Sequence, residues 1–300
     1  YALNSRILGK SCHVAILSAT LHYHLSLMST VPATATIIVR NESSNIVECI
    51  NSVSFFDEVL VVDSGSIDDT VAKANQLGAR VIVNQWPGFS RQRQFATENA
   101  SNEWVFSIDA DERVSDELRH AIEQVFEDGT KLDGYQINRR NHFMGQALAH
   151  GEGYPDWLLR LFHRGRAEWS HDAVHERVKL NGRIGKIKGD LNHHSQESLD
   201  AYFHKQNMYS TLQATSMWES GRRSSLLKIA ASPTVRFLKF YVMRLGFLDG
   251  VPGLVHIAIG CFSSFAKYAK LRELEINGGA GLPEDDPISP ALGKAGSTNP

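Results

Sequence analysis

The stretch FSIDADE, residues 106–112, ends an apolar run with three acidic residues in four positions. Residues 104–108 are short, apolar and partly β-branched, which predicts a buried β-strand. Asp109 follows that strand directly, and Asp111 lies two residues later, on the same side of an extended chain. The stretch therefore predicts two carboxylates projecting into one cleft at the carboxyl end of an interior strand.

Segments upstream repeat this rhythm of buried strand and helix. Residues 35–39, 58–62 and 80–83 predict strands, while residues 46–53, 67–77, 90–99 and 115–126 predict helices, with Ser90 as an N-cap. Strands that alternate with helices predict an α/β fold whose mainly parallel sheet has helices on both faces. Ligands of such sheets bind beyond the carboxyl ends of the strands.

A second acidic turn, VVDSGSIDDT at residues 61–70, follows the second predicted strand. Gly65 permits a tight turn, and Ser66 or Asp68 is suited to cap the next helix. This turn chemistry leaves Asp63 unexplained, which makes it a candidate acceptor for a base N–H or ribose hydroxyls. A strand–turn–helix connection without a ligand is the alternative interpretation.

Two carboxylates in one cleft repel each other unless a cation neutralises them. Mg²⁺ or Mn²⁺ meets that need, because hard cations prefer oxygen ligands and leave positions open for phosphate oxygens. Asp109 and Asp111 are thus the candidate metal ligands, and a diphosphate leaving group would complete the coordination. The alternative is a solvated acidic turn that caps the following helix.

Three motifs in this order, TIIVRNESSNI (36–46), VVDSGSIDDT (61–70) and FSIDADE (106–112), resemble the family 2 inverting glycosyltransferases of GT-A fold. The resemblance covers roughly residues 34–195. It extends to the bacterial lipopolysaccharide-core β-glucosyltransferases through WPGFSRQRQFA (86–96), YPDWLLRLFHRG (154–165), AVHE (173–176), FYVMRLGFLDGVPGL (240–254) and FAKYAKLRE (265–273). It implies a UDP-glucose donor, a lipid A–core acceptor and attachment to the inner leaflet.

The resemblance also implies roles for single residues. It assigns the nucleotide sugar to Arg40, Glu42, Asp63, Arg91, Arg93 and Asp109, and the metal to Asp109 and Asp111. Within this set, Glu42 would face the nucleotide, and Arg91 and Arg93 lie where a basic residue could meet the diphosphate.

An inverting transfer needs a carboxylate that takes the proton of the acceptor hydroxyl. Many relatives carry Glu-Asp at the corresponding place, whereas this chain reads HDAVHE at residues 171–176. Glu176 is the first candidate for the catalytic base and Asp172 the second. A structural salt bridge of Glu176 with Arg177 or Arg160 is the competing interpretation.

The C-terminal third is basic and aromatic. Residues 221–272 contain nine Lys and Arg but one acid, Asp249, and many Leu, Phe and Tyr lie between them. This composition predicts association with an anionic membrane surface, and the uncharged residues 250–266 are interpreted as lying in the interface. The alternatives are a helical subdomain with a solvated basic face, or a patch that grips phosphates of the acceptor.

Whole-chain composition sets further bounds. A net charge of −2 argues against a nucleic-acid binder, and three widely spaced cysteines favour a reducing cytosol. We predict an N-terminal extension outside the fold at residues 1–33, a catalytic domain at 34–195, an amphipathic helical region at 196–277 and a disordered tail at 278–300.

The sequence thus predicts a metal-dependent glycosyltransferase, peripheral on the inner face of the cytoplasmic membrane, that adds glucose to the lipopolysaccharide core. The alternatives are another nucleotide-sugar enzyme of the same fold, namely a polyprenyl-phosphate glycosyltransferase or a sugar nucleotidyltransferase, and a non-catalytic glycan- or membrane-binding protein. A nucleotidyltransferase would carry a Gly-rich basic loop after the first strand, where this chain reads RNESSN.

Overall fold

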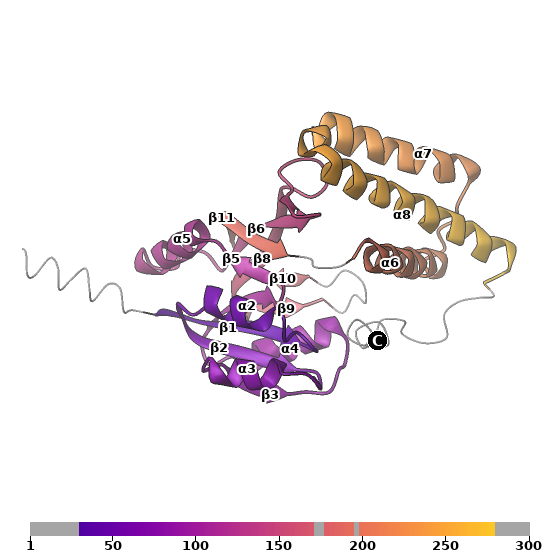
Figure 1. Ribbon diagram of the computed structural model, residues 1–300. Coiled ribbons are helices and arrows are strands. Elements are labelled where there is room, and N and C mark those ends of the chain that lie inside the picture. The colour runs from indigo at the N-terminus through magenta and orange to yellow at the C-terminus, as the bar shows by residue number, and fades with distance from the viewer. Residues whose placement is uncertain (1–29, 171–176, 195–197, 280–300) are drawn as a thin grey trace, which may run out of the picture.

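The computed structural model describes residues 30–170, 177–194 and 198–279 (Figure 1). The strands are β1 (Val31–Val39), β2 (Phe56–Asp63), β3 (Arg80–Val83), β4 (Trp104–Asp109), β5 (Glu112–Val114), β6 (Gly134–Phe143), β7 (Gln146–Ala147), β8 (Asp156–His163), β9 (Ala167–Trp169), β10 (Val178–Leu180) and β11 (Ile184–His194). The helices are α2 (Ile46–Ser52), α3 (Thr70–Gln76), α4 (Phe89–Glu98), α5 (Asp116–Glu127), α6 (Leu199–Glu219), α7 (Leu226–Phe237) and α8 (Gly250–Ile276), with short turns η1 (Arg164–Arg166), η2 (Leu238–Met243) and η3 (Gly246–Asp249).

The central sheet has nine strands in the order β3-β2-β1-β4-β8-β6-β11-β5, with β7 paired to β6. The pairs from β3 to β4 are parallel, as the sequence predicts. Beyond β4 the sheet is mixed, because β8 is antiparallel to both β4 and β6, while β11 runs parallel to β6. The carboxyl ends of β1, β2, β4, β6 and β11 and the start of β8 consequently share one edge.

Helices cover both faces of the parallel half. Ile46, Cys49 and Ile50 of α2 and Leu118 and Ile122 of α5 are buried in one core cluster with the inward side chains of β1. On the opposite face, Ala96 of α4 packs against Leu60 and Val62 of β2. Strands buried on both faces need apolar side chains at consecutive positions, which is why their sequences are recognisable.

Two helix starts differ from prediction. Helix α3 begins at Thr70 rather than residue 67, because the Asp68 carboxylate accepts from the Thr70 backbone N–H at 3.0 Å and holds a turn before the helix. The prediction that Ser90 caps α4 is wrong. Gly88 precedes that helix, and the Ser90 hydroxyl donates instead to the Ser170 carbonyl.

The C-terminal region forms a bundle in which α8 packs against α6 and α7 (Figure 1). A break after η2, with Leu245 at φ 56°, separates the α7 segment from α8. Within the described residues, one helical stretch, Gly246–Ile276, is long and apolar enough to cross a membrane by length and composition.

The loop between β7 and β8 joins the bundle to the sheet. Asp249 is buried and accepts from the backbone N–H of Ala149 and of His150, the latter at 2.8 Å. Arg236 of α7 forms an ion pair with Glu152, and Arg244 donates to the Tyr154 carbonyl at 3.3 Å. These contacts fix the helical bundle to the same end of β6 and β8 at which the acidic residues lie.

Candidate functional site

The loops that follow β1 and β2 are locked together by hydrogen bonds. The Asn41 N–H donates to the Ser66 hydroxyl at 2.9 Å, and the Ile67 N–H donates to the Asn41 side-chain oxygen at 2.9 Å. The Glu42 N–H donates to the Thr70 hydroxyl at 2.8 Å. The first two motifs therefore form one rigid wall, in which Asn41 adopts φ 57°, a left-handed conformation that asparagine tolerates better than most residues.

Asp63 is buried within this wall. Its carboxylate accepts from the N–H groups of Gly65 and Ser66, each at 3.0 Å, and from the Ser66 hydroxyl at 2.5 Å. These bonds explain why an acid ends β2, since it stabilises the turn that positions Asn41 and Glu42. Its predicted contact with a nucleotide stays a prediction.

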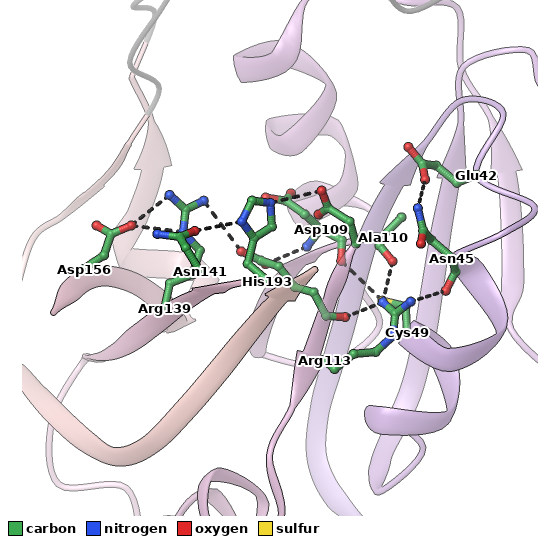
Figure 2. A network of polar contacts seen from close by, with 12 residues as sticks. Glu42, Asn45, Cys49, Asp109, Ala110, Arg113, Arg139, Asn141, Asp156 and His193 are labelled. Atoms are coloured by element: carbon green, nitrogen blue, oxygen red, sulfur yellow. Dashed lines mark hydrogen bonds and ion pairs between the residues drawn. The ribbon is translucent and has the colours of Figure 1, made fainter. Parts of the chain in front are cut away.

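Six side chains of alternating charge run along the shared edge, and we name them the ion-pair chain. They are Arg93 from α4, Asp109 from β4, Arg160 from β8, Glu112 from β5, Arg139 from β6 and Asp156 from β8. Successive nitrogen–oxygen distances are 2.6, 3.1, 2.7, 3.9 and 2.8 Å. Figure 2 shows part of this chain, with Arg139 between Asp156 and the turn that follows β4.

The arginines set the charge of the two buried acids. Burial disfavours ionisation of Asp109, but Arg93 and Arg160 outweigh it and hold the pKa of Asp109 far below its usual value. Burial raises the pKa of Glu112, and the charge of Asp109 adds to this effect. Glu112 also accepts from the Asp109 backbone N–H at 2.9 Å, so it anchors the turn that presents Asp111.

Asp111 lies beside His193 of β11. The imidazole Nδ1 is 2.8 Å from the Asn141 side-chain oxygen (Figure 2). The Nε2 is 3.1 Å from an Asp111 carboxylate oxygen. When Nδ1–H donates to Asn141, the Nε2 of a neutral ring has a lone pair that faces a carboxylate oxygen. Such a contact between two acceptors is favourable only with a positive charge between them, either a proton or a metal ion.

This pair fits a divalent cation. Both side chains are partly exposed, at 21% for His193 and 34% for Asp111. Their 3.1 Å separation is close to the roughly 3.0 Å between adjacent ligands of an octahedral ion with bonds of about 2.1 Å. No group of three or more His, Cys, Asp or Glu residues that could hold a metal occurs among the described residues, so two protein ligands would leave positions for oxygens of a substrate.

Arg40 and Glu42 lie in the loop that follows β1, at the same edge of the sheet. Burial raises the pKa of Glu42 above its ordinary value, and the charges of Asp111, Asp68 and Asp109 add to the effect, while the Asn45 amide donates to Glu42 at 2.9 Å. The Nε of Arg40 is buried and has no hydrogen-bond partner within the described part of the chain. Several acids therefore lie close to Glu42, and their combined charge would stabilise a cation or a hydrogen-bond donor bound beside them.

Only some of the predicted site residues contact one another in the structure. Arg93 reaches Asp109, whereas Arg91, two residues earlier on the same helix, is exposed. Both base candidates, Glu176 and Asp172, lie outside the described residues. The residues that flank them, Ser170 and Arg177, are joined by a 2.8 Å backbone hydrogen bond.

Sequence reasoning missed most of the residues that support the acids. Arg139, Arg160 and Asp156 come from strands β6 and β8, and nothing in their spacing shows that these strands lie beside β4. By sequence alone, His193 is interpreted as a cleft or surface histidine. The strand that carries it, β11, has polar side chains along most of its length, so the sequence offers little signal for a role of this histidine.

Comparison with known proteins agrees with this geometry. Residues 34–177 match the family described as "Glycosyl transferase family 2". An uncharacterized glycosyltransferase of Rickettsia typhi is 35% identical over 80% of this chain and 86% of its own length. The lipopolysaccharide core biosynthesis glycosyltransferase LpsC of Rhizobium meliloti is 31% identical over 82% of this chain and 93% of its own length.

Among solved structures, glucosyl-3-phosphoglycerate synthase from Mycobacterium tuberculosis overlaps in part, with 18% identity, a TM-score of 0.43, and coverage of 67% of this chain and 83% of that protein. The family match, and the relatives that match over most of both chains, agree with a GT-A-like fold for this sheet, whose parallel half carries acids at its carboxyl edge and continues into a mixed half. The chain belongs to glycosyltransferase family 2 and is a glycosyltransferase.

Proposed function

We propose that this glycosyltransferase moves glucose from UDP-glucose to the inner core of lipopolysaccharide, in a metal-dependent single displacement that inverts the anomeric carbon. The observation that supports the site is the Asp111–His193 pair at the carboxyl edge, where the imidazole Nε2 and a carboxylate oxygen lie 3.1 Å apart. The acceptor class rests on the relative named for lipopolysaccharide core biosynthesis, which matches over most of both chains.

On the donor side, the wall formed by the first two motifs would bind the nucleotide. Asp63 stabilises the turn, Arg40 offers a buried guanidinium nitrogen, and Glu42 is suited to accept from a ribose hydroxyl or a base N–H. Arg93 and Arg160 hold Asp109 ionised at the point where the diphosphate would lie. Arg91 stays a predicted diphosphate contact.

Asp111 and His193 would hold Mg²⁺ or Mn²⁺, and Asn141 would keep the His193 ring in the orientation that presents Nε2. When bound, the ion would supply positive charge to the diphosphate as the sugar departs. The sequence predicts Asp109 as a second metal ligand. Because both of its carboxylate oxygens accept from arginines, we propose that Asp111 contributes more to metal binding than Asp109 does.

On the acceptor side, Glu176 is proposed as the base that removes the proton of the attacking hydroxyl, with Asp172 as the second candidate. Glu176→Gln and Asp172→Asn separate the two assignments, because only the variant of the true base should lose transfer while it retains donor binding.

We further propose that the enzyme works as a peripheral protein on the inner face of the cytoplasmic membrane. Exposed apolar side chains with fractional exposures of 82% for Leu226, 78% for Met243 and 64% for Val251 support this location. Basic residues lie among them, which suits an anionic lipid surface.

The test is transfer of labelled glucose from UDP-glucose to truncated inner-core lipopolysaccharide, with Mg²⁺ or Mn²⁺ and with EDTA. We expect transfer that EDTA abolishes, that Asp111→Asn lowers about 100-fold or more, and that the exposed control Glu127→Gln leaves unchanged. Transfer to polyprenyl phosphate in place of lipopolysaccharide would overturn the acceptor. Full transfer in EDTA would overturn the role of the metal.

A further inference from the structure

A pocket separate from the carboxylate edge lies between α7, η2 and α8. Figure 1 shows α7 and α8 at the upper right. Its volume is about 500 Å³. The residues that line it are Leu227, Lys228, Ala231, Ser232, Val235, Arg236, Lys239, Phe240, Ser264 and Tyr268. None of them belongs to the ion-pair chain or to the loops after β1 and β2, so the glycosyltransferase site does not account for this pocket.

The pocket carries an excess of positive charge. Of its three cations, Arg236 forms an ion pair with Glu152, whereas Lys228 donates to the Arg223 backbone carbonyl and Lys239 lies 5.1 Å from the centre of the Phe240 ring. Lys228 and Lys239 form no ion pair with a carboxylate in the described part of the chain. Burial and the charge of Arg236 lower the pKa of nearby Lys267, which is consistent with a positive potential at this place.

The same pocket has an apolar side and hydroxyl groups. Leu227 and Val235 are exposed at 76% and 61%, although side chains of this type are usually covered in a folded protein. Ser232 and Ser264 lie within hydrogen-bond distance of each other, at 2.5 Å, and Tyr268 also lines the pocket. Lysines and hydroxyls are suited to bind a phosphate, while the apolar side chains are suited to contact a hydrocarbon chain.

We propose that this pocket binds a lipid-borne phosphate. Lys228 and Lys239 contact the phosphate, the serine hydroxyls donate to its oxygens, and the hydrocarbon chain lies along Leu227 and Val235. The phosphate could belong to a phospholipid of the bilayer or to the glycolipid that accepts the sugar. The inference rests on the proposed function only for the presence of a membrane, because the pocket is distinct from the transfer site.

The test is calorimetric titration of the full chain with short-chain dihexanoyl phosphatidylglycerol, and separately with detergent-solubilised lipid A and with inorganic phosphate. Ala231→Phe fills the pocket without changing charge, and Ala230→Phe adds the same ring at the neighbouring exposed position that does not line it. We expect Ala231→Phe to weaken lipid binding about tenfold or more, through loss of roughly two buried methylene contacts. Lys239→Ala is expected to weaken binding about fivefold, and Ala230→Phe to leave it unchanged.

Comparing the affinities for the two lipids identifies the source of the phosphate, because the lipid that binds more tightly is the one that the pocket prefers. The proposal is overturned if neither lipid binds, if Ala231→Phe binds as wild type does, or if inorganic phosphate binds as tightly as the lipids. Transfer to a soluble, deacylated acceptor is measured on the same variants. If the wild type transfers sugar but binds neither lipid, the pocket proposal alone is contradicted. If it binds lipid but transfers no sugar, the proposed function alone is contradicted.

Discussion

Two regions of this enzyme differ in whether their charged side chains form ion pairs. At the carboxyl edge of the sheet, the ion-pair chain places buried arginines and acids in alternation, so the protein itself neutralises them. On the α7–α8 surface, Lys228 and Lys239 form no ion pair in the described part of the chain, and apolar side chains are exposed beside them. The difference is consistent with our proposals that the transfer reaction takes place at the edge and that the helical surface contacts a lipid.

The largest effect is expected when the ion-pair chain loses the buried guanidinium of Arg160. Arg160→Met leaves Asp109 and Glu112 close together and short of one buried partner, which should lower the free energy of unfolding by about 3–5 kcal/mol. The matched control is Arg119→Met, whose ion pair with Glu123 lies on the surface and should contribute less than about 1 kcal/mol. Denaturant unfolding of both variants checks this. Equal losses of the free energy of unfolding would contradict a special contribution of the ion-pair chain to stability.

Asp111 should separate function from stability at the same edge. It is 34% exposed and contacts one imidazole, so Asp111→Asn should change the free energy of unfolding by less than about 0.5 kcal/mol while transfer falls about 100-fold or more. His193→Gln should weaken the apparent affinity for the metal ion in the same assay. Unchanged transfer in both variants would show that the cation site lies elsewhere.

On the helical surface, the effect should appear in membrane binding and not in folding. Leu226→Ser or Met243→Ser removes an exposed apolar side chain worth about 1.5–3 kcal/mol when fully buried in lipid, so partition to anionic vesicles should fall about tenfold or more. Thermal unfolding in solution should stay the same. Wild-type partition in both variants would contradict a membrane role for this surface.

The smallest effect concerns Glu42. Burial raises its pKa in the folded protein above the value in the unfolded chain, so the folded state keeps a proton that the unfolded state has already lost. The free energy of unfolding therefore falls as pH rises from the unfolded pKa to the folded pKa. Glu42→Gln should remove that decline and raise the melting temperature at neutral pH by about 2 °C. Melts from pH 4 to 8 measure it, and a loss of stability at neutral pH would contradict burial of the Glu42 carboxylate as the cause.

The sequence was most informative where strands are buried on both faces. β1 to β4 are runs of apolar, often β-branched residues, and their predicted positions were confirmed, with β3 matching at both ends. β11 carries polar residues along most of its length, so its hydrophobic pattern indicates little. It also contains a bulge at Gly189, whose φ of 94° and close approach to Leu118 leave no room for a side chain.

The site followed the same division. The local rule that ligands lie beyond strand ends directed attention to Asp63, Asp109 and Asp111, and all three lie at or just after the ends of parallel strands in the structure. The partners of these acids depend on strand order, which a single sequence does not contain. Arg160 and His193 are 51 and 82 residues from the acids that they contact, and only pairing of β8 with β4 and of β11 with β5 brings them together.

Calorimetric titration with UDP tests the central claim most directly, because it reports on the edge without requiring the acceptor. The wild type should bind UDP in the presence of Mn²⁺ and bind far more weakly in EDTA, and Asp111→Asn should bind equally weakly under both conditions. If the wild type binds UDP with the same affinity in Mn²⁺ and EDTA, or if Asp111→Asn retains the full metal effect, Asp111 and His193 do not form the metal site of this glycosyltransferase.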